Sequence, residues 1–157
     1  MIKLERFVFS DSSEYLELAK DDVELKKYFT LAYCKDNEEA KDLMELCIQS
    51  TNYESFKILN DNNRIVGIIL GEKKPKNVIE VCYFIGKKHR GRGYCKETIK
   101  EFARYLSENT EYTELEFCVF NTNKKSRYFV EKNLKLKPKI LYEGIAVYKS
   151  KLEELFN

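Results

Sequence analysis

The segment from Val78 to Cys95 reads VIEVCYFIGKKHRGRGYC, an apolar run followed by a basic loop that contains three glycines. The run Val78–Ile85 is apolar except for Glu80, which predicts a central strand covered on both faces. After Gly93, apolar residues recur at helical spacing. Glycines between a strand and a helix let backbone N–H groups converge, and the positive end of the helix adds to them. We therefore predict a strand, an anion-binding loop and a helix.

The rest of the chain carries apolar patterns of both kinds. β-branched or alternating runs predict strands, and the clearest amphipathic stripe, from Asn37 onward, predicts a helix. The expected strands are residues 2–9, 55–59, 64–71, 113–120, 136–142 and 145–148, and the other expected helices are 13–19, 23–29 and 123–132, the last with Asn133 as a left-handed cap. This order predicts an α/β or α+β domain around one mixed sheet.

The composition fits one ordinary domain. The chain has 157 residues, a formal charge of +2, 43% hydrophobic positions and 34% charged positions. No apolar run approaches the roughly 20 residues of a membrane span, and the charged start lacks a signal-peptide core, so we expect a cytoplasmic protein without a membrane partner. Five scattered cysteines without a CxxC pair, and a single histidine, predict neither a metal site nor a disulfide framework.

Charge is unevenly distributed along the chain. Residues 1–62 carry 8 basic and 14 acidic side chains, residues 86–104 carry 7 and 2, and residues 123–139 carry 7 and 1. If the fold joins the two basic segments, their field favours a phosphorylated cofactor, while the acidic first third favours a cationic partner. Solvated lysines on helix faces are the alternative interpretation. The coincidence of basic charge with a glycine loop favours the cofactor.

Residues 90–95 read RGRGYC. This loop resembles the acetyl-CoA signature of the GNAT acyltransferase superfamily, in which Arg or Gln, two residues, Gly, one residue and Gly or Ala surround the pyrophosphate. Cys95 stands where Gly or Ala is usual. A dinucleotide fingerprint and a Walker loop fit less well, because the third glycine and the Gly-Lys-Ser/Thr ending are missing. The resemblance implies a single GNAT-like domain over residues 1–157, with a mixed, mostly antiparallel sheet flanked by helices.

Further motifs resemble the branch of this superfamily that acetylates the N termini of ribosomal proteins. They are Tyr-aromatic-Ile-Gly before the loop, Gly-Tyr inside it, and Asn-Lys-Lys-Ser from Asn123 to Ser126; together they lie within about residues 78–134. In that branch the helix after Asn-x-x-Ser usually ends Glu-Lys-x-Gly-Phe, whereas residues 131–134 read EKNL here. Val130 stands where many members of the superfamily have a general-acid tyrosine.

The resemblance implies an acetyl-CoA site on the loop and an amine-bearing acceptor. We expect Arg90 and Arg92 to contact phosphate and Asn123 to contact the pantetheine arm; surface charge and a helix cap are the respective alternatives. A backbone N–H near Phe84 or Ile85 is implied as the donor to the acyl carbonyl. The expected cofactor-binding residues are Phe84, Ile85, Arg90, Gly91, Arg92, Gly93, Tyr94, Cys95 and Asn123.

The predicted catalytic residues are Glu80, Ser126 and Tyr128. Transfer of an acyl group to an amine requires loss of an amine proton, and Glu80 is the one carboxylate in the strand before the loop. Members of the superfamily often place a base on this strand; alternatively, Glu80 pairs with a lysine or faces solvent. Ser126 is preferred to Tyr128 as proton donor to the leaving thiolate. No cysteine has an obvious histidine partner, so we prefer direct transfer to a covalent acetyl-cysteine route.

These features of the sequence are compatible with three functions of the protein. The leading hypothesis is an acetyl-CoA-dependent N-acetyltransferase acting on a protein N terminus, a peptide, a polyamine or a small metabolite. The second is a non-catalytic acyl-CoA-binding regulatory module, which the missing tyrosine and the altered helix end favour. The third is an RNA-binding domain that uses the basic loop; we expect no nucleic-acid partner, because the aromatic residues do not follow the basic segments.

Overall fold

The computed structural model describes all residues from 1 to 157 and divides them into two compact units. The first unit comprises Met1–Gly71 and Cys82–Thr98, and the second comprises Glu72–Val81 and Ile99–Asn157. Strands β3 (Ile65–Lys74) and β4 (Val78–Ile85) and helix α4 (Tyr94–Asn109) contribute residues to both units. No helix has the length and apolar character needed to cross a membrane.

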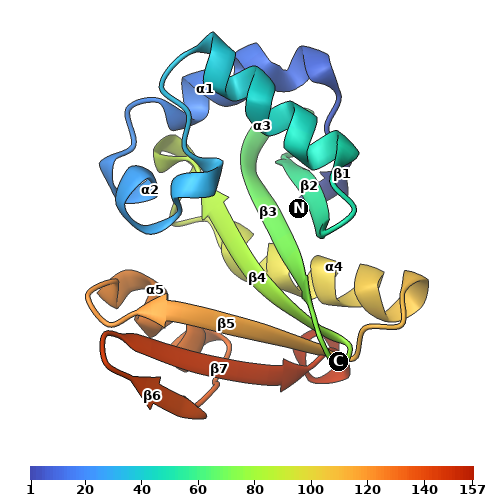
Figure 1. The fold of residues 1–157 in the computed structure, drawn as a ribbon, viewed down its shortest axis with the longest axis vertical. Coiled ribbons are helices and arrows are strands. Elements are labelled where there is room, and N and C mark those ends of the chain that lie inside the picture. Colours follow the sequence, from blue (N-terminus) through green and yellow to red (C-terminus); the bar gives the residue numbers. More distant parts are fainter. The chain divides into compact units, whose positions relative to one another are not determined.

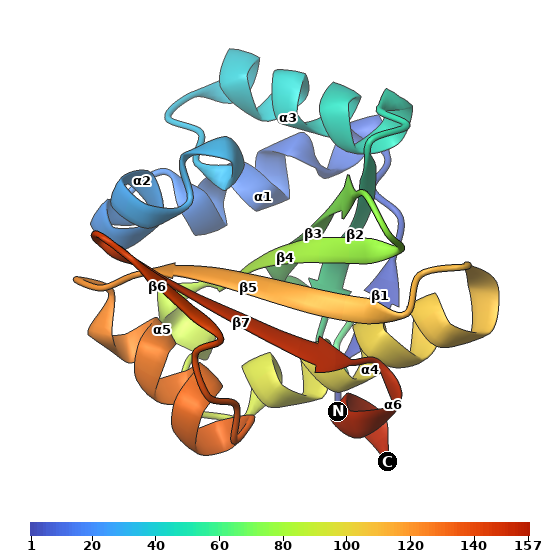
Figure 2. The same ribbon diagram turned by 60° about the horizontal axis from the view of Figure 1, so that its bottom comes forward.

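The first unit packs its helices against strands (Figure 1). It contains β1 (Lys3–Glu5), α1 (Ser12–Ala19), α2 (Val23–Tyr28), α3 (Asn37–Gln49), β2 (Tyr53–Leu59) and short 3-10 turns at Phe9–Asp11, Thr30–Ala32 and Lys87–His89. Helices α1, α2 and α3 lie on the same side of β2 and β3 in both ribbon views (Figures 1 and 2). The core beneath them includes Tyr15, whose buried hydroxyl donates a hydrogen bond to the Ala32 carbonyl at 2.7 Å.

Helix α3 shows how the apolar stripe determines the packing. Its buried residues are Ala40, Leu43, Met44 and Cys47, which recur at helical spacing, whereas Ile48, the fifth residue of the expected stripe, is exposed. The helix begins after Asp36, whose Oδ1 accepts a hydrogen bond from the Glu39 N–H at 2.9 Å. This cap satisfies one of the N–H groups that a helix start leaves without an intrahelical partner.

The second unit is built on β5 (Glu114–Phe120), β6 (Ile140–Tyr142) and β7 (Ile145–Lys151). These strands lie side by side in Figure 2, where β7 pairs antiparallel with both β5 and β6. The start of β4 pairs parallel with β5, from Val78 opposite Glu114 to Glu80 opposite Glu116. The helical segments of this unit are most of α4, then α5 (Lys124–Tyr128), a π-helical turn at Phe129–Asn133, and α6 (Glu153–Phe156).

The strand order is β1-β2-β3-β4-β5-β7-β6 in one seven-stranded sheet. The pairs β1–β2, β5–β7 and β6–β7 are antiparallel, and β4–β5 is parallel. The predicted mixed, mostly antiparallel sheet flanked by helices is therefore confirmed. The bounds expected for β4 match the structure at both ends.

Three local expectations are wrong. The first strand stops at Glu5 instead of continuing to residue 9, and the Val8 N–H donates to the Asp11 carboxylate in the following turn. The strand expected over residues 136–142 comprises only Ile140–Tyr142. The left-handed residue after the helix that follows β5 is Lys135, with φ of 59°, and not Asn133, because Asn133 is the last residue of the π-helical turn that continues the helix.

Removing the cap of α3 should destabilise the first unit. We expect Asp36→Ala to lower the free energy of unfolding by about 1 kcal/mol, because the Glu39 N–H loses its acceptor. Urea denaturation followed by circular dichroism measures this change. Asp36→Asn keeps an acceptor oxygen and is the matched control; an equal loss in both variants would contradict the role of the cap.

Candidate active site

The loop after β4 contains two left-handed glycines that face open space. Gly91 and Gly93 both have φ of +78°, a left-handed conformation that glycine adopts without steric cost. No atom lies within 4 Å of the position that a Cβ would occupy at either glycine. Helix α4 begins immediately afterwards at Tyr94. Left-handed glycines before a helix start are the backbone features of an anion cradle, so the predicted anion-binding role of the loop stays a prediction that this geometry is consistent with.

Basic side chains surround this cradle. Lys87, Lys88 and Arg92 are exposed, and His89 is half-buried. Burial lowers the pKa of His89 below its ordinary value, and the charges of Arg92 and Lys88 lower it further. His89 is therefore mainly neutral near pH 7, and the positive field at the loop comes from lysine and arginine side chains.

Arg90 makes contacts within the first unit that the sequence did not indicate. Its Nε donates a hydrogen bond to the Ile85 carbonyl at 2.8 Å, and its Nη2 lies 2.7 Å from Oδ2 of Asp22. The Asp22 side chain is almost fully buried, and its other oxygen caps α2 by accepting from the Leu25 N–H. Arg90 thus attaches the loop to the start of α2. The expected contact of Arg90 with phosphate stays a prediction, and Arg92 is the arginine whose side chain is free to make one.

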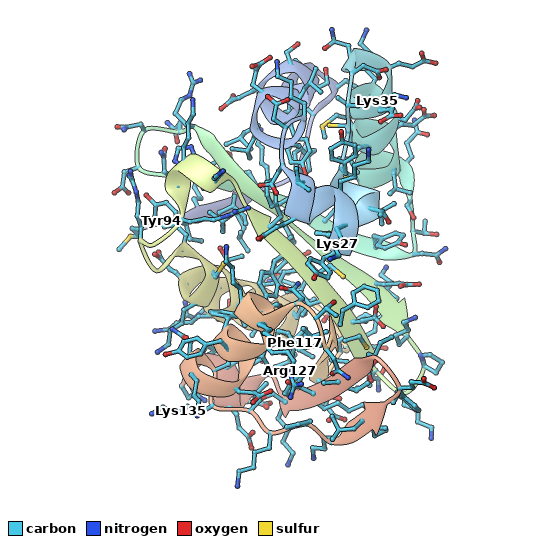
Figure 3. All side chains as sticks on the ribbon, turned by 90° about the vertical axis from the view of Figure 1, so that its left-hand side faces the viewer. Lys27, Lys35, Tyr94, Phe117, Arg127 and Lys135 are labelled. Atoms are coloured by element: carbon cyan, nitrogen blue, oxygen red, sulfur yellow. The ribbon has the colours of Figure 1, made fainter.

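The remaining expected cofactor residues of this unit lie around the end of β4. Phe84 and Ile85 are buried, and Tyr94 and Cys95 at the start of α4 pack with Ile85 and Val66. Tyr94 is labelled in Figure 3. Burial raises the pKa of the Cys95 thiol to about 11, so Cys95 behaves as a small apolar residue.

The second unit places two carboxylates and a thiol together. Glu80 on β4 lies directly opposite Glu116 on β5, and the Cys118 Sγ lies 3.5 Å from Oε1 of Glu80 and 3.6 Å from Oε1 of Glu116. Lys74 Nζ lies 3.9 Å from Oε1 of Glu80, and Lys149 Nζ lies 3.5 Å from Oε2 of Glu116. Glu80 thus has a lysine neighbour, as the alternative interpretation expected, and its side chain stays 24% exposed to solvent.

The cluster of Glu80, Glu116 and Cys118 contains atoms that could bind a metal ion, but its charges are also balanced by lysine side chains without an ion. The ligand atoms of Glu80, Glu116 and Cys118 lie within 4.8 Å of one another. Each carboxylate has a lysine as counter-charge, so the geometry alone assigns no ion. The pKa of the Cys118 thiol is raised far above its ordinary value by burial first, and then by the charges of Glu80 and Glu116. Cys118 is therefore a neutral thiol and a weak nucleophile.

Helix α5 carries the other predicted residues. Asn123 caps the helix, since its Oδ1 accepts a hydrogen bond from the Ser126 N–H at 3.3 Å. Asn123 and Ser126 are half-buried, whereas Tyr128 is 65% exposed. Val130 is fully buried. The cap interpretation of Asn123 is confirmed, and it leaves the amide nitrogen of that side chain for a further contact.

Sequence reasoning missed a polar cluster that holds α5 in place. Arg127, labelled in Figure 3, donates to Glu131 at 2.9 Å, to the Tyr148 hydroxyl at 3.3 Å and to the Asn121 side chain at 3.4 Å. The Tyr148 hydroxyl also donates to Glu131. Hydrogen bonds from Tyr148 and then from Arg127 lower the pKa of Glu131. The spacing of Arg127 and Glu131 signals a helical ion pair, but nothing in the sequence points to Tyr148 on β7.

Comparisons with known proteins identify the family. A sequence model of the acetyltransferase (GNAT) domain matches residues 2–133, so the chain belongs to the GNAT acetyltransferase family. No curated protein matches the chain by sequence. The predicted superfamily is confirmed, and with it the prediction of an acetyltransferase.

Solved structures share the fold at low sequence identity. A GNAT acetyltransferase from Bacillus anthracis is 16% identical, with a TM-score of 0.79 over 97% of this chain and 95% of that chain. The spermidine N-acetyltransferase of Vibrio cholerae, solved with CoA and spermine, is 13% identical, with a TM-score of 0.79 over 99% and 98%. RimL, a ribosomal L7/L12 alpha-N-protein acetyltransferase, is 13% identical, with a TM-score of 0.81 over 96% and 90%. The resemblance to the ribosomal-protein branch thus extends to the fold.

A side chain at Gly93 should block the cradle. We expect Gly93→Val to abolish CoA binding in isothermal titration calorimetry, because the new side chain fills the space that phosphate would enter. The left-handed φ adds strain of roughly 1–2 kcal/mol, so the fold should persist. Gly144→Val is the matched control, since Gly144 has φ of +82° and equally open surroundings. Undiminished affinity in Gly93→Val would remove the assignment of the loop.

The neutral state of Cys118 can be tested by alkylation. The raised pKa keeps the thiol protonated above the pH at which a free cysteine ionises, so at about pH 8.5 iodoacetamide should label Cys118 far more slowly in the folded protein than in urea. Glu116→Gln should accelerate labelling, because it removes one of the charges that raise the pKa; Glu114→Gln should not. Peptide mass spectrometry follows the reaction, and equal rates in folded and unfolded protein would contradict this electrostatic picture.

Proposed function

We propose that the chain is an acetyl-CoA-dependent N-acetyltransferase that acts on a primary amine by direct transfer. The observation that carries this proposal is the loop at Gly91 and Gly93, where two left-handed glycines, open surroundings and the start of α4 coincide with basic side chains. Membership of the GNAT family supports the choice of acetyl-CoA over other phosphorylated ligands.

The residues of the loop would hold the donor by its diphosphate. The backbone N–H groups around Gly91 and Gly93 would donate to phosphate oxygens, and the Arg92 guanidinium would add a charged contact. The Asn123 side-chain amide, with its oxygen engaged in the cap, would contact the pantetheine arm. When bound, acetyl-CoA supplies the acetyl group as a thioester and departs as the free thiol.

The protons of the reaction are assigned to two side chains. Glu80 accepts one proton from the acceptor nitrogen as a nitrogen–carbon bond forms to the acetyl carbonyl carbon. Ser126 donates its hydroxyl proton to sulfur as the carbon–sulfur bond breaks and regains a proton from solvent, to which Glu80 releases the one it accepted. The amine attacks in its neutral form, after its ammonium proton has passed to solvent, so one proton leaves the neutral amine and one reaches the thiol. Ser126 is preferred because Tyr128 is largely exposed to solvent. Cys118 takes no covalent part, because its thiol stays protonated.

The class of acceptor follows from the same carboxylates. The fold occurs in acetyltransferases named for spermidine and for a ribosomal-protein N terminus, which are both amines that carry positive charge in water. Glu80 and Glu116 lie opposite each other on β4 and β5 and would attract such an amine. We propose a protein N terminus, a peptide, a polyamine or a small metabolite as the acceptor.

The cytoplasmic location and the single domain over residues 1–157 stay predictions.

A second candidate is a non-catalytic acyl-CoA-binding module. The buried Val130 favours it, because that position carries a general-acid tyrosine in many members of the superfamily and here has no proton to give. Both candidates bind CoA, so turnover distinguishes them. An absence of transfer to every amine in a panel of peptides, polyamines and small metabolites would favour the module.

Replacing Glu80 should separate binding from chemistry. We expect Glu80→Gln to lower kcat by about 10²–10⁴-fold with acetyl-CoA affinity little changed, because the amide cannot accept the amine proton. Release of free CoA thiol in steady-state assays measures kcat. Glu72→Gln is the matched control, since Glu72 also pairs with Lys74 but lies on β3. An unaltered kcat in Glu80→Gln would overturn its role as the base.

A further inference from the structure

The two faces of strand β5 differ in burial. Leu115, Phe117 and Val119 are buried, whereas the side chains that alternate with them are half-buried or exposed. Because successive side chains of a strand point to opposite faces of the sheet, this second set lies on the other face. We call it the open face of the second unit; on β5 it carries Glu114, Glu116, Cys118 and Phe120.

Strand register places a charged row on the open face. Glu80 of β4 is opposite Glu116 of β5, and Glu116 is opposite Lys149 of β7. The Cys118 Sγ lies 3.5 Å from Oε1 of Glu80 and 3.6 Å from Oε1 of Glu116, so both carboxylates share this face with the thiol. The proposed function places the acceptor amine at this row.

Two apolar rows follow the charged row along β5. Phe120 is 46% exposed and Tyr142 is 59% exposed, so apolar side chains at this end of the open face are in contact with solvent. Residues two apart on a strand are separated by about 7 Å, so the two rows lie about 7 and 14 Å beyond the carboxylates. The first row consists of Cys118, Val147 and Ile140, and the second of Phe120, Ile145 and Tyr142.

A molecule that covers this face needs a positive charge at one end and apolar groups along the rest. A polyamine carries ammonium groups along its length, and an ammonium group over an apolar row would lose hydration without gaining a counter-charge. A small amine with one apolar group is too short to cover both rows. An extended peptide presents every second side chain to one face, about 7 Å apart, which matches the spacing of the rows.

We infer that the acceptor is the N terminus of an extended peptide, with its α-amine at Glu80 and Glu116 and its apolar side chains on the two apolar rows of the open face. The inference rests on the proposed function and narrows its acceptor to one class. The α-amine loses one proton and gains the acetyl group. Its ordinary pKa of about 7.7–8.0 is lower than that of a lysine amine, so more of it is neutral near pH 7.

Transfer to three pentapeptides that begin with serine tests the preference. One has leucine at the second and fourth positions, one has leucine at the third and fifth positions, and one is entirely serine. The leucine peptide whose side chains face the sheet should have a kcat/KM about 10-fold above that of the serine peptide, because apolar surface leaves water on both partners. Release of free CoA thiol measures the rates.

The outcomes separate this inference from the proposed function. Equal kcat/KM for all three peptides, or a higher value for spermidine than for either leucine peptide, would overturn the inference while the proposed function stands. If no peptide, polyamine or small amine is acetylated, the proposed function itself fails and the inference fails with it.

Two substitutions on β6 distinguish the open face from the opposite one. Tyr142→Ser should lower the ratio of kcat/KM between the preferred leucine peptide and the serine peptide by about threefold, because it removes an apolar side chain from the second row. Leu141→Ser is the matched control. Leu141 is also exposed, but it is opposite the buried Ala146 and so lies on the other face. An equal loss in both variants would contradict the inference.

A measurement on the unmodified protein needs no variant to fold. With ¹³C-methyl-labelled isoleucine, the preferred leucine peptide should shift the methyl signals of Ile140 and Ile145 and leave that of Ile79, which is fully buried, unchanged. No shift at Ile140 and Ile145, at a peptide concentration that saturates turnover, would overturn the inference.

A second copy of the chain is the competing occupant of the open face. We expect sedimentation analysis to give the same mass for the wild-type protein, Tyr142→Ser and Leu141→Ser. A dimer that only Tyr142→Ser dissociates would show that another copy covers the apolar rows, and would overturn the inference.

Discussion

The ion pair between Arg90 and the buried Asp22 is the contact on which the loop depends. A carboxylate removed from water needs a counter-charge and hydrogen bonds, and Asp22 obtains them from Arg90 and from the start of α2. Arg90 in turn holds the Ile85 carbonyl at the end of β4. One guanidinium thus fixes the point where β4 leaves the sheet and the glycine loop begins.

The chemistry proposed for the second unit also depends on how charges are paired. Glu80 and Glu116 would repel each other as direct neighbours, and Lys74 and Lys149 offset that repulsion. Burial, and then the charges of the same carboxylates, raise the pKa of the Cys118 thiol and keep it protonated. In the proposed reaction, one arrangement would therefore provide a base for an amine and suppress a competing nucleophile, which is consistent with direct transfer.

Much of the fold could be predicted from local patterns. The bounds of β4 and the apolar stripe of α3 follow from the pattern of apolar residues along the chain. Predictions failed at the ends of elements. The first strand stops before the turn in which the Val8 N–H donates to the Asp11 carboxylate, and a π-helical turn continues the helix after α5 through Asn133.

The sequence by itself determined the family and the loop, because the glycines and arginines of the loop are contiguous and their backbone requirements are local. Only the tertiary structure decided the partners of those residues. The contact of Arg90 with Asp22, the opposition of Glu80 and Glu116, and the approach of Phe84 to Gly67 each join distant parts of the chain. Such pairs follow from strand register and helix packing, which depend on the whole core and not on any one segment.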